Sequence, residues 1–254
     1  MNFQKGANRI GWTDATWNVI AGCPHDCHWL MPTSQGEMLP CYADTNATGL
    51  AKKYYPQGFA HYYFHPERLN EPLEVKVPLK IFPDSMSDML AHWTPREHIQ
   101  QIIGIMEKAN WHIFQPLTKN PKRYLEFTWP KNVWCGFSLA PTMMNGHLLN
   151  TRQQECFMEV GFEVMRELRR SQGVLTWNSA EPLSWDCASQ YENCGLQWVV
   201  IGAASNGQKK YQPDRKHLEN LLDVLDKQHI PIYFKENLSY TPRREEFPKS
   251  ATSA

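Results

Sequence analysis

Residues 22–43, with the sequence GCPHDCHWLMPTSQGEMLPCYA, hold three of the seven cysteines of the chain. Cys23 and Cys27 are separated by three residues, and Cys41 follows after thirteen more. Thiols gathered in this way, in a chain without the marks of a secreted disulfide framework, more often bind a metal than stay unused. This stretch, called the cysteine loop below, is therefore the predicted metal centre, and the rest of the chain is expected to form a scaffold around it.

The composition and charge exclude several classes of protein. The 254 residues are 42% hydrophobic, enough to fill one large core, and their formal net charge is +0. A neutral chain has no overall field that would indicate a nucleic-acid or membrane partner. Residues 1–18 lack the apolar stretch of a signal peptide, and there is no run of about 18 apolar residues. We therefore expect a cytoplasmic protein with no membrane partner.

Downstream of the cysteine loop, short apolar strands alternate with amphipathic helices. This order favours parallel βα units, and the strands are nearly continuous apolar runs, as expected when both faces are covered. The predicted fold class is α/β, a partial or full (β/α) TIM-like barrel, and the competing arrangement is an open doubly wound sheet. Residues 1–240 would form one barrel-like domain and residues 241–254 a flexible tail. Strands are predicted at 17–20, 80–83, 111–117, 133–139, 174–178, 198–201 and 230–234, and helices at 43–55, 94–106, 152–171 and 214–229.

Three thiols admit two kinds of metal site. A structural zinc ion takes four protein ligands, so a zinc site would need His25 or His28 beside the cysteines. Three cysteines without a fourth ligand suit a 4Fe–4S cluster in which one iron stays open. An open iron is what allows a cluster to bind a cofactor or substrate.

The cysteine spacing resembles the motif of the radical S-adenosylmethionine (radical SAM) superfamily, Cys-x3-Cys-x2-Cys with an aromatic residue before the last cysteine. Cys23 and Cys27 match the first two positions, and Trp29 stands where the aromatic residue belongs. Leu30 occupies the third cysteine position. Cys41, eleven residues later, would have to supply the third thiol.

A narrower resemblance covers most of the chain. Eight ordered segments are similar to an uncharacterised family of proteins associated with phages and bacterial mobile elements, which carries a three-cysteine motif and is generally regarded as radical-SAM-like. The segments are IGWTDATWN (10–18), the two ends GC and CYA of the cysteine loop, HPERLNEPL (65–73), IFPDSMSDML (81–90), FQPLTKNPKR (114–123), NVWCGFSL (132–139), SAEPL (179–183) and IPIYFKENL (230–238).

The resemblance implies an enzyme with a barrel of the radical SAM type, in which Cys23, Cys27 and Cys41 bind a 4Fe–4S cluster. It implies that an electron from the cluster cleaves S-adenosylmethionine (AdoMet) to a 5′-deoxyadenosyl radical, with an electron donor protein as a partner. The family has no agreed substrate. Its association with phages favours a nucleic acid or a nucleoside.

Polar residues that follow the predicted strands are the predicted cofactor and substrate contacts. In the superfamily, the region after the second strand contacts the amino group of the methionine moiety, and the region after the fourth contacts ribose or carboxylate groups. Lys119 is a further candidate for binding a carboxylate or phosphate. The predicted cofactor-binding residues are Ser85, Asp88, Ser138 and Ser205, and the predicted catalytic residues are Glu181 and Lys235.

Other classes of function stay open from the sequence. A binding or accessory protein of a phage could use a zinc or iron–sulfur site to fold, without radical chemistry. A hydrolytic or transfer enzyme could be built on Glu181, Asp88 and Lys235, with structural cysteines. Residues 84–88 could also form no more than a turn or a helix cap.

Overall fold

The computed structural model describes residues 1–5, 9–32, 36–206 and 209–249. The strands that pair in parallel are β2 (Ala15–Trp17), β7 (Lys80–Pro83), β8 (Ile113–Phe114), β9 (Leu117–Thr118), β10 (Trp134–Ser138), β13 (Leu175–Ala180), β14 (Trp198–Ile201) and β17 (Ile232–Phe234). The α-helices are α1 (Tyr42–Thr48), α2 (Glu71–Glu74), α3 (Arg96–Lys108), α4 (Thr151–Gln172) and α5 (Arg215–Lys227). Short antiparallel strands are β1 (Asn2–Phe3), β3 (Ile20–Ala21), β4 (His28–Leu30), β5 (Met38–Pro40), β6 (Tyr63–Phe64), β11 (Met143–Met144), β12 (His147–Leu148), β15 (Ala204–Asn206) and β16 (Lys209–Tyr211). Short 3₁₀ helices are η1 (Lys52–Tyr54), η2 (Pro66–Arg68), η3 (Pro121–Glu126) and η4 (Ala188–Tyr191).

The parallel strands lie side by side in the order of the sequence. β2, β7 and β8 pair in one sheet, and β9, β10, β13, β14 and β17 pair in another. A parallel bridge between Phe114 and Val133 joins the two sheets. Neighbouring parallel strands need a crossover connection, so each strand returns through a segment outside the sheet. The mixed α/β class predicted from the alternating pattern is thereby confirmed.

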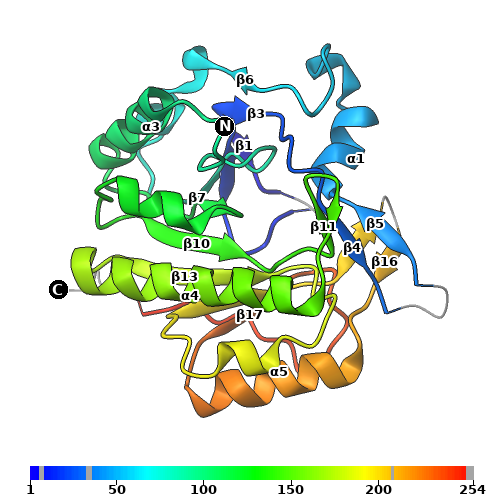
Figure 1. Ribbon diagram of the computed structural model, residues 1–254. Helices are drawn as coiled ribbons and strands as arrows, with labels where there is room; N and C mark the ends of the chain where they lie inside the picture. Colours follow the sequence, from blue (N-terminus) through cyan, green and yellow to red (C-terminus); the bar gives the residue numbers. More distant parts are fainter. Residues whose placement is uncertain (6–8, 33–35, 207–208, 250–254) are drawn as a thin grey trace.

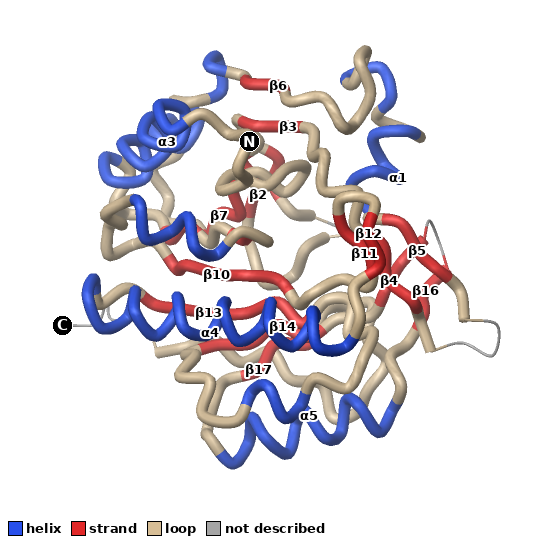
Figure 2. Tube along the Cα trace, viewed as in Figure 1, coloured by secondary structure: helices blue, strands red, loops and turns tan. Residues whose placement is uncertain are grey.

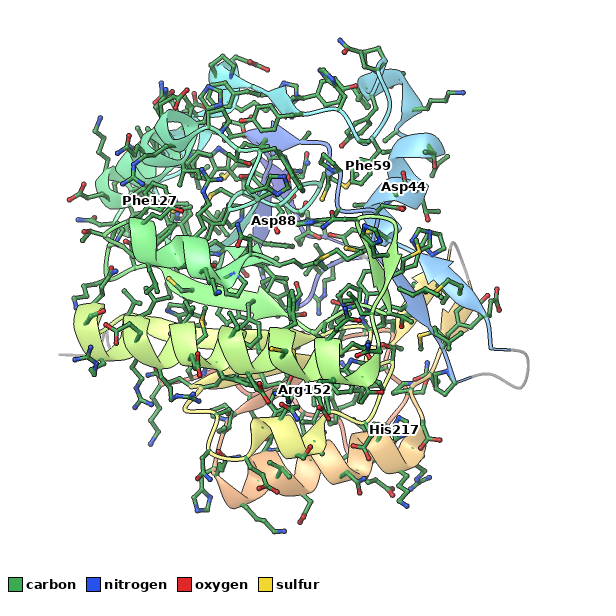
Figure 3. The ribbon with its side chains drawn as sticks, viewed as in Figure 1. Asp44, Phe59, Asp88, Phe127, Arg152 and His217 are labelled. Atoms are coloured by element: carbon green, nitrogen blue, oxygen red, sulfur yellow. The ribbon has the colours of Figure 1, made fainter. Side chains whose placement is uncertain are left out.

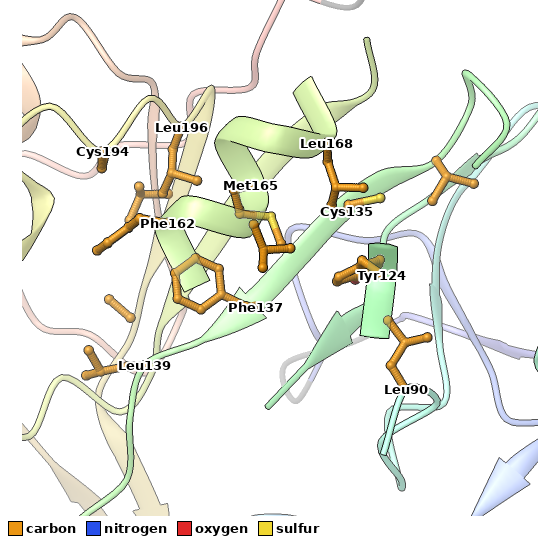
Figure 4. Packing of buried hydrophobic residues seen from close by; sticks show 14 of the residues in the cluster. Leu90, Tyr124, Cys135, Phe137, Leu139, Phe162, Met165, Leu168, Cys194 and Leu196 are labelled. Carbon is orange, nitrogen blue, oxygen red and sulfur yellow. The ribbon is translucent and has the colours of Figure 1, made fainter. Parts of the chain in front are cut away.

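The long helices cover the outer face of these strands (Figures 1 and 2). Helix α4 packs on β10 and β13, and Figure 4 shows Phe162, Met165 and Leu168 of this helix facing Phe137 of β10. The rings of Phe137 and Phe162 are 5.2 Å apart at a steep angle. The helix begins at a capping box formed by Asn150 and Gln153 and ends at Gly173, whose φ is 62°.

The inner face of the strands carries a separate aromatic cluster. Trp12 packs against both Trp177 and Trp198, with ring centroids 5.1 and 6.1 Å away, and all three are buried. Gly136 of β10 makes room for this cluster, because a Cβ atom there would lie 2.3 Å from the Trp177 ring. The space enclosed at the amino ends of the strands is therefore filled by side chains.

The described strands do not close into a barrel. The free edge of β2 is paired with the antiparallel β1. The free edge of β17 is paired at Tyr233 with Glu245, and Phe234 N–H donates to the Arg244 carbonyl. A full barrel would require β2 and β17 to pair with each other, and both edges are already occupied.

Residues 241–254, expected as a flexible tail, pack on the domain at least as far as Phe247, which stacks on Trp198. Residues 250–254 lie outside the described part.

The helix predicted at 43–55 is shorter, since α1 ends at Thr48 and η1 follows it. Two predicted strands also differ from the structure, for local reasons. The strand expected at 111–117 is divided into β8 and β9 around Pro116, which has no N–H to donate to a neighbouring strand. The strand expected at 17–20 is divided as well, because Ile20 N–H donates to the Asp84 carboxylate at 2.7 Å and β3 pairs with β6 instead. Within the described residues, no helix is both long enough and apolar enough to cross a bilayer.

Two helical glycines allow a matched test of the packing between α4 and β10. Gly161→Ala places a Cβ about 2.2 Å from the Phe137 ring, whereas a Cβ at Gly104 in α3 meets no atom within 4 Å outside its own helix. We expect Gly104→Ala to raise the free energy of unfolding by about 0.5–1 kcal/mol, and Gly161→Ala to lower it by about 1–3 kcal/mol. Urea unfolding at equilibrium measures both. A Gly161→Ala protein as stable as Gly104→Ala would contradict the described packing.

Candidate functional site

The three cysteines of the cysteine loop line one cavity of about 230 Å³. Cys23 follows β3, Cys27 precedes β4, and Cys41 stands immediately before α1. The floor and walls come from the carboxyl ends of β7, β9 and β10, as is usual for sites on parallel sheets. Figure 3 shows Asp44 on α1, Phe59 near this helix and Asp88 nearer the middle of the molecule. Other residues that line the cavity are Tyr42, Phe82, Ser85, Thr118, Lys119 and Ser138.

The thiols sit in apolar surroundings. Cys27 is buried in a cluster with Trp29 and Leu39, and Cys23 and Cys41 pack against a second cluster around Phe59. Burial raises the pKa of Cys27 to about 12, although the Lys119 ammonium acts in the opposite direction. Burial, with a contribution from the Asp88 charge, also raises the pKa of Cys23. These two thiols are therefore protonated at neutral pH until a metal takes the place of the proton.

In the described residues the donor side chains are not gathered around one point. Four ligands around zinc at about 2.3 Å would bring sulfur atoms to about 3.8 Å from one another. Within the described residues, no three His, Cys, Asp or Glu side chains are arranged to hold one ion. His25 Nε2 lies 3.0 Å from the Asp88 carboxylate, and His28 Nδ1 lies beside Asp26. Both histidines line the cavity, and each of these contacts occupies only one ring nitrogen, so the histidines stay possible metal ligands. A 4Fe–4S cluster binds each cysteine at a different iron and so does not need three donors around one ion.

Asp88 is the most heavily hydrogen-bonded group at the cavity. Its carboxylate accepts from the Thr118 hydroxyl at 2.7 Å, from Lys119 N–H at 2.8 Å and from His25 Nε2 at 3.0 Å. Leu90 N–H donates to it at 3.1 Å. Burial acts to raise the pKa of Asp88, but the bonds from His25, Thr118 and Lys119 outweigh burial and hold the pKa below its ordinary value. The buried carboxylate is therefore ionised at neutral pH.

The predicted serines are divided between the cavity and its surroundings. Ser85 lines the cavity and donates its hydroxyl to Asn18 Oδ1 at 3.0 Å. Ser138, at the end of β10, lines the cavity and is buried. Ser205 is not among the lining residues; it accepts from the Asn237 amide at 3.2 Å on the β15–β16 hairpin. The structure thus brings Ser85 and Ser138 to the cysteines and leaves Ser205 aside.

The two candidate lysines have different surroundings. Lys235 forms an ion pair with Glu181 between the ends of β17 and β13, and neither residue lines the cavity. The Lys119 ammonium lies 5.6 Å from the centroid of the Trp29 ring and, within the described part of the chain, has no hydrogen bond or ion pair. Burial lowers the pKa of Lys119, but the neighbouring Cys27, Cys41 and Asp88 more than compensate, so the net shift is upward. Lys119 is therefore a cation facing the thiols.

Several contacts at the site were not predicted from the sequence. Tyr42 donates its hydroxyl to the Ser85 carbonyl at 2.6 Å, and Thr118 holds the Asp88 carboxylate. His25 was considered only as a zinc ligand. Thr118 and Lys119 lie at the end of a strand, and this position is a sequence signal for a place at the cavity. The contact of His25 with Asp88 has no such signal, because the two residues are 63 positions apart.

The sequence matches one family model, and the fold is similar to that of solved structures. A family model described as "Protein of unknown function (DUF5131)" matches residues 7–253. No curated protein matches.

Solved structures of spore photoproduct lyase are similar in fold. One mutant of that enzyme aligns with a TM-score of 0.51 and 11% identity, covering 94% of this chain and 80% of the other. A second mutant, with bound AdoMet and dinucleoside spore photoproduct, aligns with a TM-score of 0.45 and 10% identity, covering 84% of this chain. The alignment covers 61% of that second chain, less than two thirds of its length. At such identities the similarity concerns the fold alone.

The buried carboxylate of Asp84 gives a pH-dependent prediction. One of its oxygens accepts from Ile20 N–H, and the other is buried without a partner among the described residues. Burial raises the pKa of Asp84 to about 8. The folded state binds this proton more tightly than the unfolded state. The contribution of protonated Asp84 to the free energy of unfolding is therefore fully present below about pH 4 and is lost as the pH rises to about 8. The uncharged Asp84→Asn, whose amide oxygen can accept from Ile20, should gain stability relative to wild type by about 1 kcal/mol per pH unit over this range. Urea unfolding at pH 5, 6.5 and 8 measures this, and a difference independent of pH would contradict it.

Proposed function

This chain belongs to the DUF5131 family, and from this premise we propose that it is a radical-SAM-like iron–sulfur enzyme that cleaves AdoMet reductively and acts on a nucleic acid or nucleoside. The observation that carries the proposal is the position of Cys23, Cys27 and Cys41 around one cavity at the carboxyl ends of parallel strands. The similarity of the cysteine spacing to the radical SAM motif supports it. The fold similarity to spore photoproduct lyase supports a partial barrel of the radical SAM type.

The donor set fits a cluster held by cysteines alone. Three thiols line the cavity, which matches the number of ligands in the proposal; His25 and His28 line it too, with His25 Nε2 beside Asp88 and His28 Nδ1 beside Asp26. A 4Fe–4S cluster with one open iron supplies, when bound, the binding position for AdoMet and the electron that cleaves its sulfonium group. An external electron donor protein is part of the proposal. Zinc is the alternative metal, for an accessory protein without radical chemistry.

The residues of this chain have separate tasks in the proposal. Phe59, Phe82 and Trp29 exclude water from the thiols, because they make the cavity walls or the packing behind them apolar. Lys119 offers its ammonium to the negative charge gathered at three thiolates. Ser138 and Ser85 offer hydroxyl groups to a bound cofactor.

In this proposal the substrate binds outside the cavity that holds the cysteines. Another structure of spore photoproduct lyase contains AdoMet and a dinucleoside, which makes a nucleic-acid component the substrate class to test first. Glu181 and Lys235 are proposed as the substrate-handling pair at the ends of β13 and β17. Ser205 would reach only a ligand that extends past the cavity. The seven free cysteines suit a reducing compartment, and we propose the cytoplasm.

Metal and cofactor analysis tests the proposal. We expect anaerobically purified protein to contain about four irons and four sulfides per chain, with an absorption band that bleaches with dithionite. The reduced protein should convert AdoMet to methionine and 5′-deoxyadenosine, measured by liquid chromatography. One zinc per chain without sulfide would exclude the radical chemistry.

Single cysteine replacements assign the ligands. Cys23→Ala, Cys27→Ala and Cys41→Ala should each lose most of the iron, because each removes one of three thiolate ligands. The matched control is Cys156→Ala, which removes an exposed thiol from α4 and should keep the iron content of wild type. An unchanged cluster in Cys41→Ala would remove Cys41 from the ligand set.

A further inference from the structure

A single turn after β7 contacts the cysteine loop near all three cysteines. Gly22, next to Cys23, donates its N–H to the Met86 carbonyl at 3.0 Å, and its carbonyl accepts from the Ser87 hydroxyl at 2.7 Å. Tyr42, next to Cys41, donates to the Ser85 carbonyl at 2.6 Å. Residues 85–88, called the clamp turn below, thus hold both ends of the loop.

The middle of the loop is held by Asp88 alone among the side chains of the clamp turn. His25 lies between Cys23 and Cys27, and its Nε2 is 3.0 Å from Asp88 Oδ2. Both side chains are buried, with 7% and 6% of their surface exposed. The edge of the Trp93 ring system packs against the imidazole at 4.6 Å between centroids, so the ring has little freedom to turn.

The Asp88 carboxylate has no acceptor position left for a cofactor. Oδ1 accepts from the Thr118 hydroxyl and Leu90 N–H, and Oδ2 accepts from His25 and Lys119 N–H. An ionised carboxylate offers about four such positions. A cofactor amino group could bind Asp88 only by displacing one of these buried bonds, which would leave another buried polar group unpaired.

We propose that Asp88 is a positioning residue: through His25 it fixes the segment between Cys23 and Cys27 against the ends of β7 and β9. The identity of the group held by the loop rests on the proposed function, but the fixation of the loop does not. This assignment differs from the sequence-based prediction of Asp88 as a cofactor contact. Thr118 orients the carboxylate, and the contact from Asn145 N–H to the His25 carbonyl at 2.6 Å holds the loop from its other side.

Hydrogen exchange of the metal-free protein tests the fixation directly. The amides of Gly22 and Cys23 are hydrogen-bonded to Met86 and Phe59, so their exchange reports on opening of the loop. Asp88→Asn replaces one carboxylate oxygen, which accepts two hydrogen bonds, with an NH₂ group that cannot accept them. We therefore expect the backbone amides of Gly22 and Cys23 to exchange at least about tenfold faster. The matched control is Asp44→Asn, in the same cavity, whose carboxylate has no hydrogen bond within the described residues; its exchange should stay within about twofold of wild type.

A second pair of variants keeps the test decisive if Asp88→Asn does not fold. His25→Ala removes the donor and should speed exchange at Gly22 and Cys23, whereas His25→Gln retains a donor that can reach Asp88 and should restore protection. Amides of β13 and β14 should exchange as in wild type in all folded variants, which separates local opening from general destabilisation.

The reconstituted protein distinguishes positioning from cofactor contact. If Asp88 positions the loop, Asp88→Asn loses iron to a chelator faster than wild type, and the AdoMet dissociation constant per bound cluster is unchanged. Normal loop protection together with an AdoMet dissociation constant raised tenfold or more would overturn the inference and make Asp88 a cofactor contact. A protein that binds neither iron nor AdoMet would refute the proposed function, while the exchange data would still decide the role of Asp88.

Discussion

Parallel pairing of strands in chain order is the constraint on which the rest of the structure depends. Each strand must return through a crossover before its neighbour can pair, so all the turns that follow strands lie at one end of the sheet. The cysteine loop follows β2 and β3, the clamp turn follows β7, and Lys119 follows β9. Residues separated by up to about a hundred positions thereby meet around one cavity.

The inner aromatic cluster decides how deep that cavity is. Trp12, Trp177 and Trp198 fill the space between the amino ends of the strands, and Gly136 leaves room for the Trp177 ring. The cavity lies at the carboxyl ends, where small or polar side chains such as Ser138 line it. Dense packing at the amino ends thus places this cavity on the side that carries the cysteines.

Charged side chains at this end of the sheet differ in whether they have a partner. Asp88 is neutralised by hydrogen-bond donors, and Glu181 and Lys235 neutralise each other. Lys119 has no such partner within the described residues and faces the thiols. A half-buried cation without a counter-ion is stabilised when a negative group joins it. In the proposed function, three thiolates that bind a metal would supply this charge.

The sequence by itself determined the α/β class, most strand and helix positions, and the cysteine loop as the candidate site, because these depend on local periodicity and residue spacing. Its departures had local causes, such as Pro116 dividing one predicted strand. The open sheet and the partners of Asp88 were decided only by the tertiary structure. Whether β2 meets β17 depends on which segments reach their edges, and β1 and residues 244–246 do so first. Likewise, a carboxylate after a strand can bind a ligand or hold a loop in place. The hydrogen bonds of Asp88 with His25 and Thr118, 63 and 30 residues away, support the second role that we propose, and no local pattern encodes a contact at such a separation.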